Sequence, residues 1–466
     1  MPAQTQTIDE PQVSAELLQR YDRPGPRYTS YPTAVEFHDR FGATDYADRL
    51  TRIDPGQPLS LYVHLPFCEH RCTFCGCNVV ITHKREVVAR YLDWLDREID
   101  LIAGLIPGRS RVIQFHWGGG TPTYLTPDQL RRLHAAVSRR FTLLPEAEVA
   151  VEVDPRVTTR DHVDALADLG FNRLSMGVQD FTPEVQQAIG RNQDEASTRV
   201  LFDYCRRRGF GSINIDLIYG LPGQTPATFA HNLDSVVSLR PDRVAVYSYA
   251  HVPWIKGHQK RLDATRLPRG MAKLELFAQA IRTFRASGYR QIGMDHFALP
   301  DDELSVAIGE RRLHRNFMGY TVHRAPTMLG LGITAIGDVG GAYVQNRRKL
   351  STYHAALEQG VPPVEKGYAL SEDDQVRRQV ITSLMCNGFL RRQEIEERFG
   401  LDFGSYFAVE LAELQAGPVA DGLLEIGPEV LEATPLGGLF IRNIAMVFDR
   451  YLREKTRDQP TFSRTV

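Results

Sequence analysis

The sequence predicts an α/β fold in which six (β/α) units form a partial TIM barrel, with an N-terminal arm before it and a mainly helical domain after it. Short apolar segments typical of buried strands alternate with segments of helical periodicity between about residues 58 and 260. Such alternation predicts parallel strands with right-handed connections. Polar or glycine-rich residues also follow successive strands, where barrels carry their sites. A doubly wound sheet would show the same alternation and stays open.

The predicted barrel elements follow one another along the chain. The first strand precedes a helix, "REVVARYLDWLDREIDLI", and the second ends in "GGGTP". After residue 260 the alternation fades into a longer helix, about 268–288, and a glycine-rich run, "LGLGITAIGDVGG". The six strands are predicted at about residues 59–66, 111–117, 147–155, 172–180, 213–222 and 243–250.

Three parts follow from this pattern: an arm over residues 1–50, a barrel over 51–365 and a helical domain over 366–466. The arm contains "RPGPRYTSYP", residues 23–32, whose three prolines disfavour helix. We expect this segment to be extended and to contact another part of the molecule or a ligand.

Composition excludes several classes of function. The 55 basic and 57 acidic residues leave a net charge of −2, so nothing indicates nucleic-acid or membrane-surface binding. No apolar run is long enough to span a bilayer, and the polar N-terminus does not resemble a signal peptide. We therefore expect a cytoplasmic protein. Thiols stay reduced in that compartment, so clustered cysteines favour a metal or redox site over disulfides.

Four of the six cysteines lie in ten residues, "CEHRCTFCGC", while Cys205 and Cys386 stand alone. A structural zinc site normally uses two separated pairs, and a thioredoxin-type CxxC leaves two cysteines unexplained. Three thiolates on a short loop suit three irons of a [4Fe–4S] cube, with the fourth iron open to substrate. Spacing alone permits two ligand sets: Cys68, Cys72 and Cys75, or Cys72, Cys75 and Cys77.

The spacing Cys68-x3-Cys72-x2-Cys75 resembles the signature of radical S-adenosylmethionine (SAM) enzymes, whose fold is a (β/α)6 partial barrel. Further stretches resemble the oxygen-independent coproporphyrinogen III dehydrogenases within that superfamily, from the arm almost to the end of the chain. These are "YVHLPFCEHRCTFCGCN", "HWGGGTPTYL", "SMGVQD", "NIDLIYGLPGQT", "YSYAHVP", "IGMDHFALPDDEL" and "LHRNFMGYT". One departure is Met318, because the family commonly has glutamine there.

The resemblance implies a set of site residues. Cys68, Cys72 and Cys75 would ligate the cluster, and Cys77 would lie near SAM or substrate unless it only packs the loop. Two SAM molecules would share the pocket, and Cys77, Tyr62 and Glu152 would take part in catalysis. The first SAM would contact Tyr62, Gly119, Glu152 and Ile336, and the second Phe74, Gly120, Thr121, Gln179, Arg191, Asp216 and Ala250.

The implied reaction is the oxidative decarboxylation of two propionates of coproporphyrinogen III to vinyl groups, giving protoporphyrinogen IX in anaerobic haem biosynthesis. It requires a low-potential electron donor such as a flavodoxin, and we expect a monomer. A radical SAM haem chaperone is the alternative, although such proteins typically lack the arm and the fourth cysteine. In the arm, we expect Arg23 and Arg27 to pair with propionates, and Tyr28 and Tyr31 to contact the macrocycle. The alternative is that the arm is a linker pinned to the barrel.

Overall fold

A sheet of twelve strands forms the centre of the computed structural model, which describes residues 13–454 and 461–465. Its strand order is β16-β15-β14-β13-β1-β4-β5-β6-β7-β8-β10-β9. The six strands from β1 to β8 in this order are parallel, as predicted. They are β1 (Leu59–Leu65), β4 (Arg111–Gly119), β5 (Thr142–Val153), β6 (Arg173–Gln179), β7 (Ser212–Tyr219) and β8 (Arg243–Ser248).

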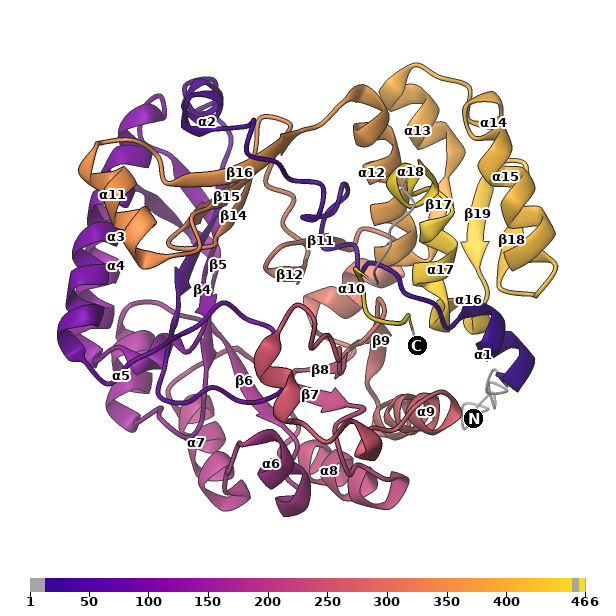
Figure 1. The fold of residues 1–466 in the computed structure, drawn as a ribbon, viewed down its shortest axis with the longest axis horizontal. Helices are drawn as coiled ribbons and strands as arrows, with labels where there is room; N and C mark the ends of the chain where they lie inside the picture. Colours follow the sequence, from indigo (N-terminus) through magenta and orange to yellow (C-terminus); the bar gives the residue numbers. More distant parts are fainter. Residues whose placement is uncertain (1–12, 455–460, 466) are drawn as a thin grey trace, which may run out of the picture.

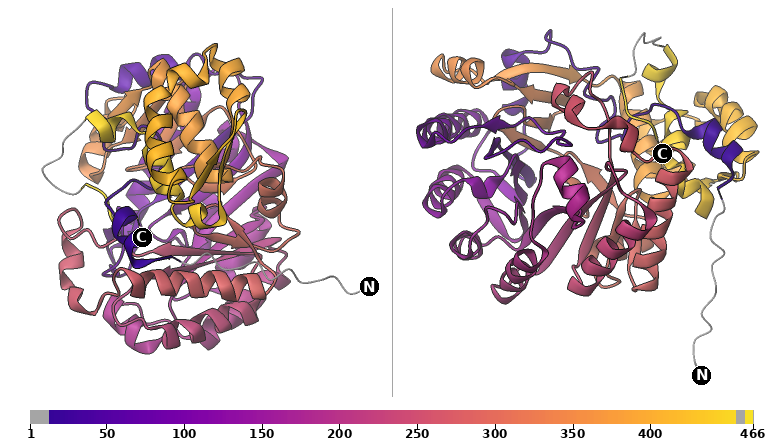
Figure 2. Two further views of the ribbon diagram at one scale, coloured as in Figure 1. Left: turned by 90° about the vertical axis from the view of Figure 1, so that its right-hand side faces the viewer. Right: turned by 60° about the horizontal axis from the view of Figure 1, so that its bottom comes forward.

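Helices connect these strands and cover the outer face of the sheet, which leaves the barrel open on one side (Figures 1 and 2). Local sequence determines where they begin: Pro127 opens α4 at its first position, and Thr126 and Gln129 form a capping box. The helices are α3 (Arg85–Leu105), α4 (Pro127–Arg140), α5 (Arg160–Asp168), α6 (Pro183–Ile189), α7 (Glu195–Arg207), α8 (Pro226–Leu239) and α9 (Met271–Ala286).

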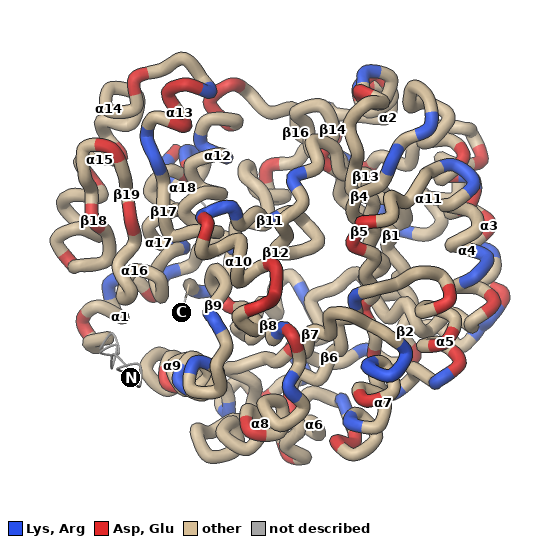
Figure 3. Tube along the Cα trace, turned by 180° about the vertical axis from the view of Figure 1, so that it is seen from behind, with Lys and Arg blue, Asp and Glu red and all other residues tan. Residues whose placement is uncertain are grey.

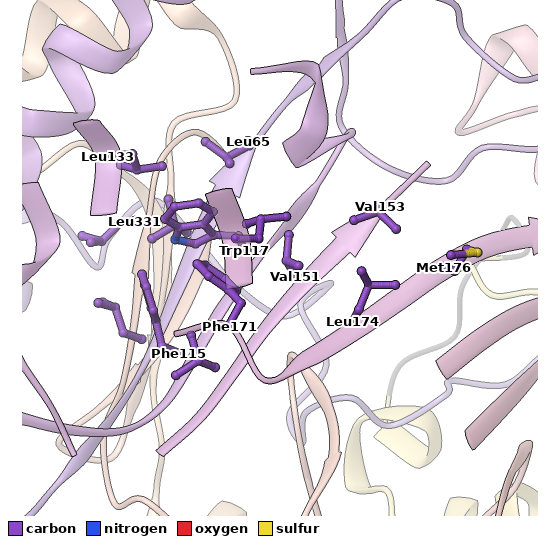
Figure 4. Packing of buried hydrophobic residues seen from close by; sticks show 14 of the residues in the cluster. Leu65, Phe115, Trp117, Leu133, Val151, Val153, Phe171, Leu174, Met176 and Leu331 are labelled. Carbon is purple, nitrogen blue, oxygen red and sulfur yellow. The ribbon is translucent and has the colours of Figure 1, made fainter. Parts of the chain in front are cut away.

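The apolar core lies between the sheet and these helices. Trp117 and Phe171 are fully or almost fully buried there, with ring centroids 4.7 Å apart, and Phe115 packs edge-on against Trp117 (Figure 4). Alternate residues of each strand therefore face the helices, and the residues between them face the inside of the barrel. In β6 every second residue is buried, which leaves Ser175 and Gln179 on the inner face.

The sheet is wider than the six predicted strands. β13 pairs parallel to β1, and three antiparallel strands follow it, whereas β10 and β9 extend the other edge. The glycine-rich run had been predicted without strands, yet it forms β13 and β14. The added elements are β9 (Arg290–Ile292), β10 (His296–Ala298), α10 (Glu303–Gly309), β11 (His314–Asn316), β12 (Gly319–Thr321), β13 (Met328–Leu331), β14 (Ile336–Val339), β15 (Ala342–Asn346), α11 (Leu350–Glu358) and β16 (Val364–Ala369).

The C-terminal part is mainly helical, as predicted, and includes a three-stranded sheet with its own apolar core (Figure 1). Because β16 still belongs to the barrel sheet, we propose that this domain begins near residue 370. Its elements are α12 (Glu372–Asn387), β17 (Phe389–Arg391), α13 (Arg392–Phe399), α14 (Phe403–Tyr406), α15 (Ala408–Leu414), β18 (Leu424–Ile426), β19 (Val430–Ala433), α16 (Pro435–Leu439), α17 (Ile441–Met446) and α18 (Arg450–Glu454).

The arm runs from α1 (Ala15–Tyr21), beside the C-terminal domain, to α2 (Ala43–Leu50), beside the barrel (Figure 1). Tyr28 and Tyr31 are 7% and 2% exposed and belong to the core of the C-terminal domain. Their predicted contact with a macrocycle is therefore wrong in this structure. The reason is that burial and a 2.8 Å hydrogen bond from Tyr28 to Asp449 hold them inside the protein.

Charged residues of both signs are interspersed over the surface, so no broad field of one sign appears on the face shown in Figure 3. Among the described residues, no helix has the length and apolar character needed to cross a membrane.

Candidate active site

Polar side chains gather on the inner face of the barrel, at the carboxyl ends of the parallel strands. Tyr62 on β1 is paired in register with His116 on β4, and their rings stack at 5.9 Å. Glu152 lies on β5 and Asp216 on β7. The Glu152 side chain is 43% exposed although its strand is central in the sheet, so it faces an open cavity.

Hydrogen bonds connect Tyr62, a member of the first predicted SAM set, to the cysteine loop through His64. His64 donates from Nε2 to the Asn78 carbonyl at 3.1 Å, which leaves Nδ1 to accept from the Tyr62 hydroxyl at 3.0 Å. Burial lowers the pKa of His64 and keeps this ring neutral. Because Asn78 directly follows Cys77, the network fixes the end of the cysteine loop against β1.

Glu152 stays ionised inside the barrel. Its Oε1 lies 3.3 Å from His116 Nε2, and its Oε2 accepts from the Gly119 amide at 3.0 Å. Desolvation alone would raise the pKa of Glu152, but the hydrogen bonds from His116 and Gly119 hold it below its usual value. The structure thus brings together Tyr62, Gly119 and Glu152, three of the four residues predicted for the first SAM.

Asp216 is the second carboxylate of the cavity. It accepts hydrogen bonds from Asn214 at 2.7 Å and from Ser175 at 3.1 Å. Desolvation, together with the nearby charge of Glu152, raises the pKa of Asp216 to about 6. Glu152 and Asp216, which belong to the first and the second predicted set, are therefore close enough to interact electrostatically.

The three glycines at the end of β4, Gly118, Gly119 and Gly120, allow close approach of other chain segments. A Cβ on Gly118 would lie 2.7 Å from Glu152, and one on Gly119, whose φ is +119°, would lie 2.6 Å from the His64 ring. A Cβ on Gly120 would lie 2.6 Å from the Pro66 backbone. Any larger residue here would displace the side chains of the network.

The cysteine loop lies between β2 (Phe67–Cys68) and β3 (Val80–Ile81). Cys68 Sγ is 3.4 Å from the hydroxyl of Thr121. Cys72 is buried between two guanidinium groups, at 3.7 Å from Arg156 Nη2 and 3.9 Å from Arg191 Nη1. Both arginines are ion-paired with Asp154.

The donor chemistry of this loop suits an iron–sulfur cluster. Within residues 13–454 and 461–465, no three His, Cys, Asp or Glu side chains converge closely enough to hold a single metal ion. A [4Fe–4S] cube binds each thiolate through a different iron, so its cysteines need not point at one atom. Soft thiolates, together with nearby N–H donors to sulfur, are what such a cluster uses.

Cys77 is exposed near the end of the cysteine loop. It interacts electrostatically with Glu152 and Tyr62, and its thiol hydrogen-bonds to Cys75, which lowers the pKa of the Cys75 thiol. Cys205 and Cys386 are buried elsewhere, in α7 and α12.

The remaining residues of the second set border the same region from several strands. Gln179 ends β6 with a φ of +67°, a strained conformation for a residue with a side chain. The pairing of β6 with β7 is irregular between Gly177 and Gln179. Arg191 donates to the Gly177 carbonyl at 2.6 Å and so lies beside this irregularity. The side-chain amide of Gln259 donates to the backbone carbonyls of Phe74 and Ala250, each at 3.2 Å.

Ile336, at the start of β14, lies behind Gly330, which is the register partner of Tyr62. Met318 lies in the turn between β11 and β12, where its amide donates to Asn316 at 2.8 Å.

Sequence reasoning missed four residues of this site: His64, His116, Asp154 and Arg156. The signal for the two histidines was present, because His64 and Tyr62 share one strand two residues apart, and His116 lies just before the glycines. Asp154 and Arg156 follow a predicted strand, but nothing local indicates contact with a cysteine 84 residues away.

Comparison with known proteins places this geometry in a family. The model of the radical SAM superfamily matches residues 62–236, and that of the HemN C-terminal domain matches residues 370–440. The chain is 47% identical over 450 residues to the oxygen-independent coproporphyrinogen III oxidase of Escherichia coli, covering 97% of this chain and 98% of the relative. The chain belongs to the family of oxygen-independent coproporphyrinogen III oxidases.

Two further comparisons agree with this family assignment. The oxidase of a Synechocystis strain is 45% identical and covers 99% of this chain and 100% of the relative. The solved structure of coproporphyrinogen III oxidase (HemN) from E. coli, described as a radical SAM enzyme, superposes with a TM-score of 0.88, over 91% of this chain and 97% of that one. Membership of the radical SAM superfamily implies a [4Fe–4S] cluster and SAM.

Proposed function

We propose that this chain catalyses the oxygen-independent oxidative decarboxylation of coproporphyrinogen III, converting two propionates to vinyl groups and yielding protoporphyrinogen IX for haem biosynthesis. The observation that carries this proposal is the placement of the cysteine loop at the same barrel rim as Tyr62, Glu152 and Asp216, in a chain similar over nearly its whole length to the oxidases.

We propose Cys68, Cys72 and Cys75 as the cluster ligands. Bound together, the cluster and SAM supply the one-electron chemistry that removes a hydrogen atom from an unactivated carbon. We propose that Cys77, which is close enough to Glu152 and Tyr62 to interact with them electrostatically, lies beside SAM or substrate rather than on iron. The Tyr62–His64–Asn78 hydrogen bonds hold that position relative to the barrel.

Two SAM molecules would fit the two sets of residues. Glu152, kept ionised by His116 and Gly119, suits the hydroxyl or ammonium groups of the first, with Tyr62 and Ile336 beside it. For the second, Gln179 and Asp216 provide polar contacts and Phe74 an apolar face. Gly120, Thr121, Arg191 and Ala250 complete this second set.

Substrate propionates require cations at the cavity. Arg27, in the arm, reaches the barrel: its guanidinium lies over the Tyr247 ring at 5.6 Å and pairs with Asp295. Arg315 donates to the Arg27 carbonyl at 3.0 Å, and its buried Nε has no hydrogen-bond partner within the part of the chain that the structure describes. We propose that Arg27 and Arg315 bind propionate carboxylates. Arg23, which is exposed, lies outside this cluster.

Turnover under anaerobic conditions tests the proposal. Protein carrying its cluster is incubated with coproporphyrinogen III, SAM and dithionite, and the tetrapyrrole is identified by mass. We expect loss of two carboxyl groups and no turnover without SAM. We further propose a low-potential physiological donor such as a flavodoxin, and a monomer in solution, which sedimentation measures.

A further inference from the structure

A loop after β8 combines exposed apolar side chains with positive charge. It covers residues 252–261, "VPWIKGHQKR", and is called here the docking loop. Trp254 and Ile255 are 49% and 55% exposed, unusual for such large apolar side chains. The loop contains Lys256, His258, Lys260 and Arg261 and no acidic residue.

Hydrogen bonds attach this loop directly to the cysteine loop. His258 Nε2 donates to the Cys75 carbonyl at 2.8 Å. Gln259, which is 1% exposed, accepts from the Val252 amide at 2.7 Å and donates to the carbonyls of Phe74 and Ala250. The exposed side chains of the docking loop are therefore presented by a segment that is held in place rather than by a loose one.

The positive charge of the docking loop is not neutralised by the chain. Among the described residues, neither Lys260 nor Arg261 has an ion-pair or hydrogen-bond partner for its side chain. Lys256 lies near Cys77 and Cys75, and also near Arg348 and Arg71, whose like charges repel it. Basic side chains beside the exposed Trp254 and Ile255 suit a partner protein whose binding surface has acidic residues at its edge.

We propose that the docking loop binds a small acidic protein that carries one electron at low potential. Trp254 and Ile255 would form the apolar anchor, because tryptophan is enriched among residues that dominate binding energy. Lys256, Lys260 and Arg261 would steer the carrier. One electron would pass from the reduced carrier to the cluster, so the carrier is oxidised by one electron and the cluster reduced by one, with no atom transferred.

The hydrogen bond from His258 to Cys75 places this contact next to a cluster ligand. The proposal rests on the proposed function, since it assumes a cluster on Cys68, Cys72 and Cys75. It adds the place at which the electron enters.

The test compares two reductants on two variants, Trp254→Ala and the double charge reversal Lys260→Glu with Arg261→Glu. The control variants are Val409→Ala, at a residue 64% exposed in the C-terminal domain, and Arg391→Glu, exposed on β17. Cluster reduction is followed by absorbance in anaerobic stopped flow, with reduced flavodoxin below saturation in one arm and dithionite in the other.

We expect the flavodoxin rate to fall on the order of tenfold in both docking-loop variants, and its salt dependence to weaken in the charge reversal. The dithionite rate should be unchanged, and the controls should match the unmodified protein with both reductants. The proposal is overturned if the flavodoxin rate is unaffected, if dithionite reduction slows equally, or if flavodoxin does not reduce the unmodified protein. A cluster that flavodoxin reduces normally, without any vinyl product, would contradict the proposed function and leave the docking loop standing.

Discussion

Arg156 Nη2 lies 3.7 Å from Cys72 Sγ, and Asp154 holds that guanidinium through its Nε and Nη2. Arg191 approaches the same sulfur at 3.9 Å and shares Asp154. Donors near a ligand sulfur stabilise the reduced, more negative form of a cluster. If Cys72 holds the cluster, as we propose, Arg156 acts on electron transfer through that sulfur.

Replacing Arg156 with glutamine should lower the reduction potential of the cluster by roughly 60 mV, a tenfold change in a one-electron equilibrium. Arg156→Lys should restore part of the shift. The potential is measured by redox titration with electron paramagnetic resonance, and Arg160→Gln on α5 is the control. An unchanged or raised potential in Arg156→Gln, with normal iron content, would show that the guanidinium does not act on the cluster.

Single serine substitutions distinguish the ligands from the other cysteines. Changes at Cys68, Cys72 or Cys75 should abolish or destabilise the bound iron, because each thiolate would hold its own iron. Cys77→Ser should keep the iron yet lose vinyl formation, and Cys205→Ser should keep both. Iron analysis and visible absorbance report the first effect. Loss of the cluster in Cys77→Ser, with retention in Cys68→Ser, would require the alternative ligand set.

The first half of the arm packs into the core of the C-terminal domain through Tyr21, Tyr28 and Tyr31. Tyr28→Phe removes a hydrogen bond to the buried carboxylate of Asp449 and should cost about 1–3 kcal/mol of unfolding free energy. Tyr46→Phe, at another buried tyrosine, is the control, and thermal unfolding measures both. For the same reason, deletion of residues 1–33 should lower stability rather than affect only catalysis. Equal stability of Tyr28→Phe and the unmodified protein would contradict this role.

Glu98, on α3, gives a pH dependence of stability. It accepts from Tyr353 and Asn346, each at 2.5 Å, and from the Gly332 amide at 2.7 Å. Desolvation outweighs these hydrogen bonds and raises the pKa of Glu98 to about 7. The pKa of Glu98 is therefore higher in the folded than in the unfolded protein. The stability that the protonated Glu98 contributes is fully present below about pH 4.5 and is lost as pH rises through about 7.

The difference in unfolding free energy between the unmodified protein and Glu98→Gln should therefore change by on the order of 3 kcal/mol between pH 4.5 and 8, with the unmodified protein losing stability. Urea unfolding at several pH values measures it. A difference that stays constant with pH would mean that Glu98 ionises normally.

The six parallel strands were predictable because their apolar residues face the helices in a regular pattern. β13 and β14 were not, because Gly330 and Gly337 interrupt any such pattern. A side chain at position 330 would clash, because its Cβ would lie 2.6 Å from the Ile336 backbone. This need for glycine is visible only once the two strands are packed together. The polar network was only partly predictable. The stacking of Tyr62 on His116 depends on the register of two strands, and a lone histidine in a strand does not disclose its partner.

The most direct test of the proposed function follows one hydrogen atom. Coproporphyrinogen III carrying deuterium at the β-carbons of its propionates is incubated anaerobically with the protein, SAM and a reductant. We predict that deuterium appears in 5′-deoxyadenosine while vinyl groups form, since the barrel would hold the propionate and SAM in one cavity. Vinyl product without deuterium transfer would contradict the radical chemistry. Stable haem binding with neither product nor transfer would contradict the proposed activity and favour a chaperone.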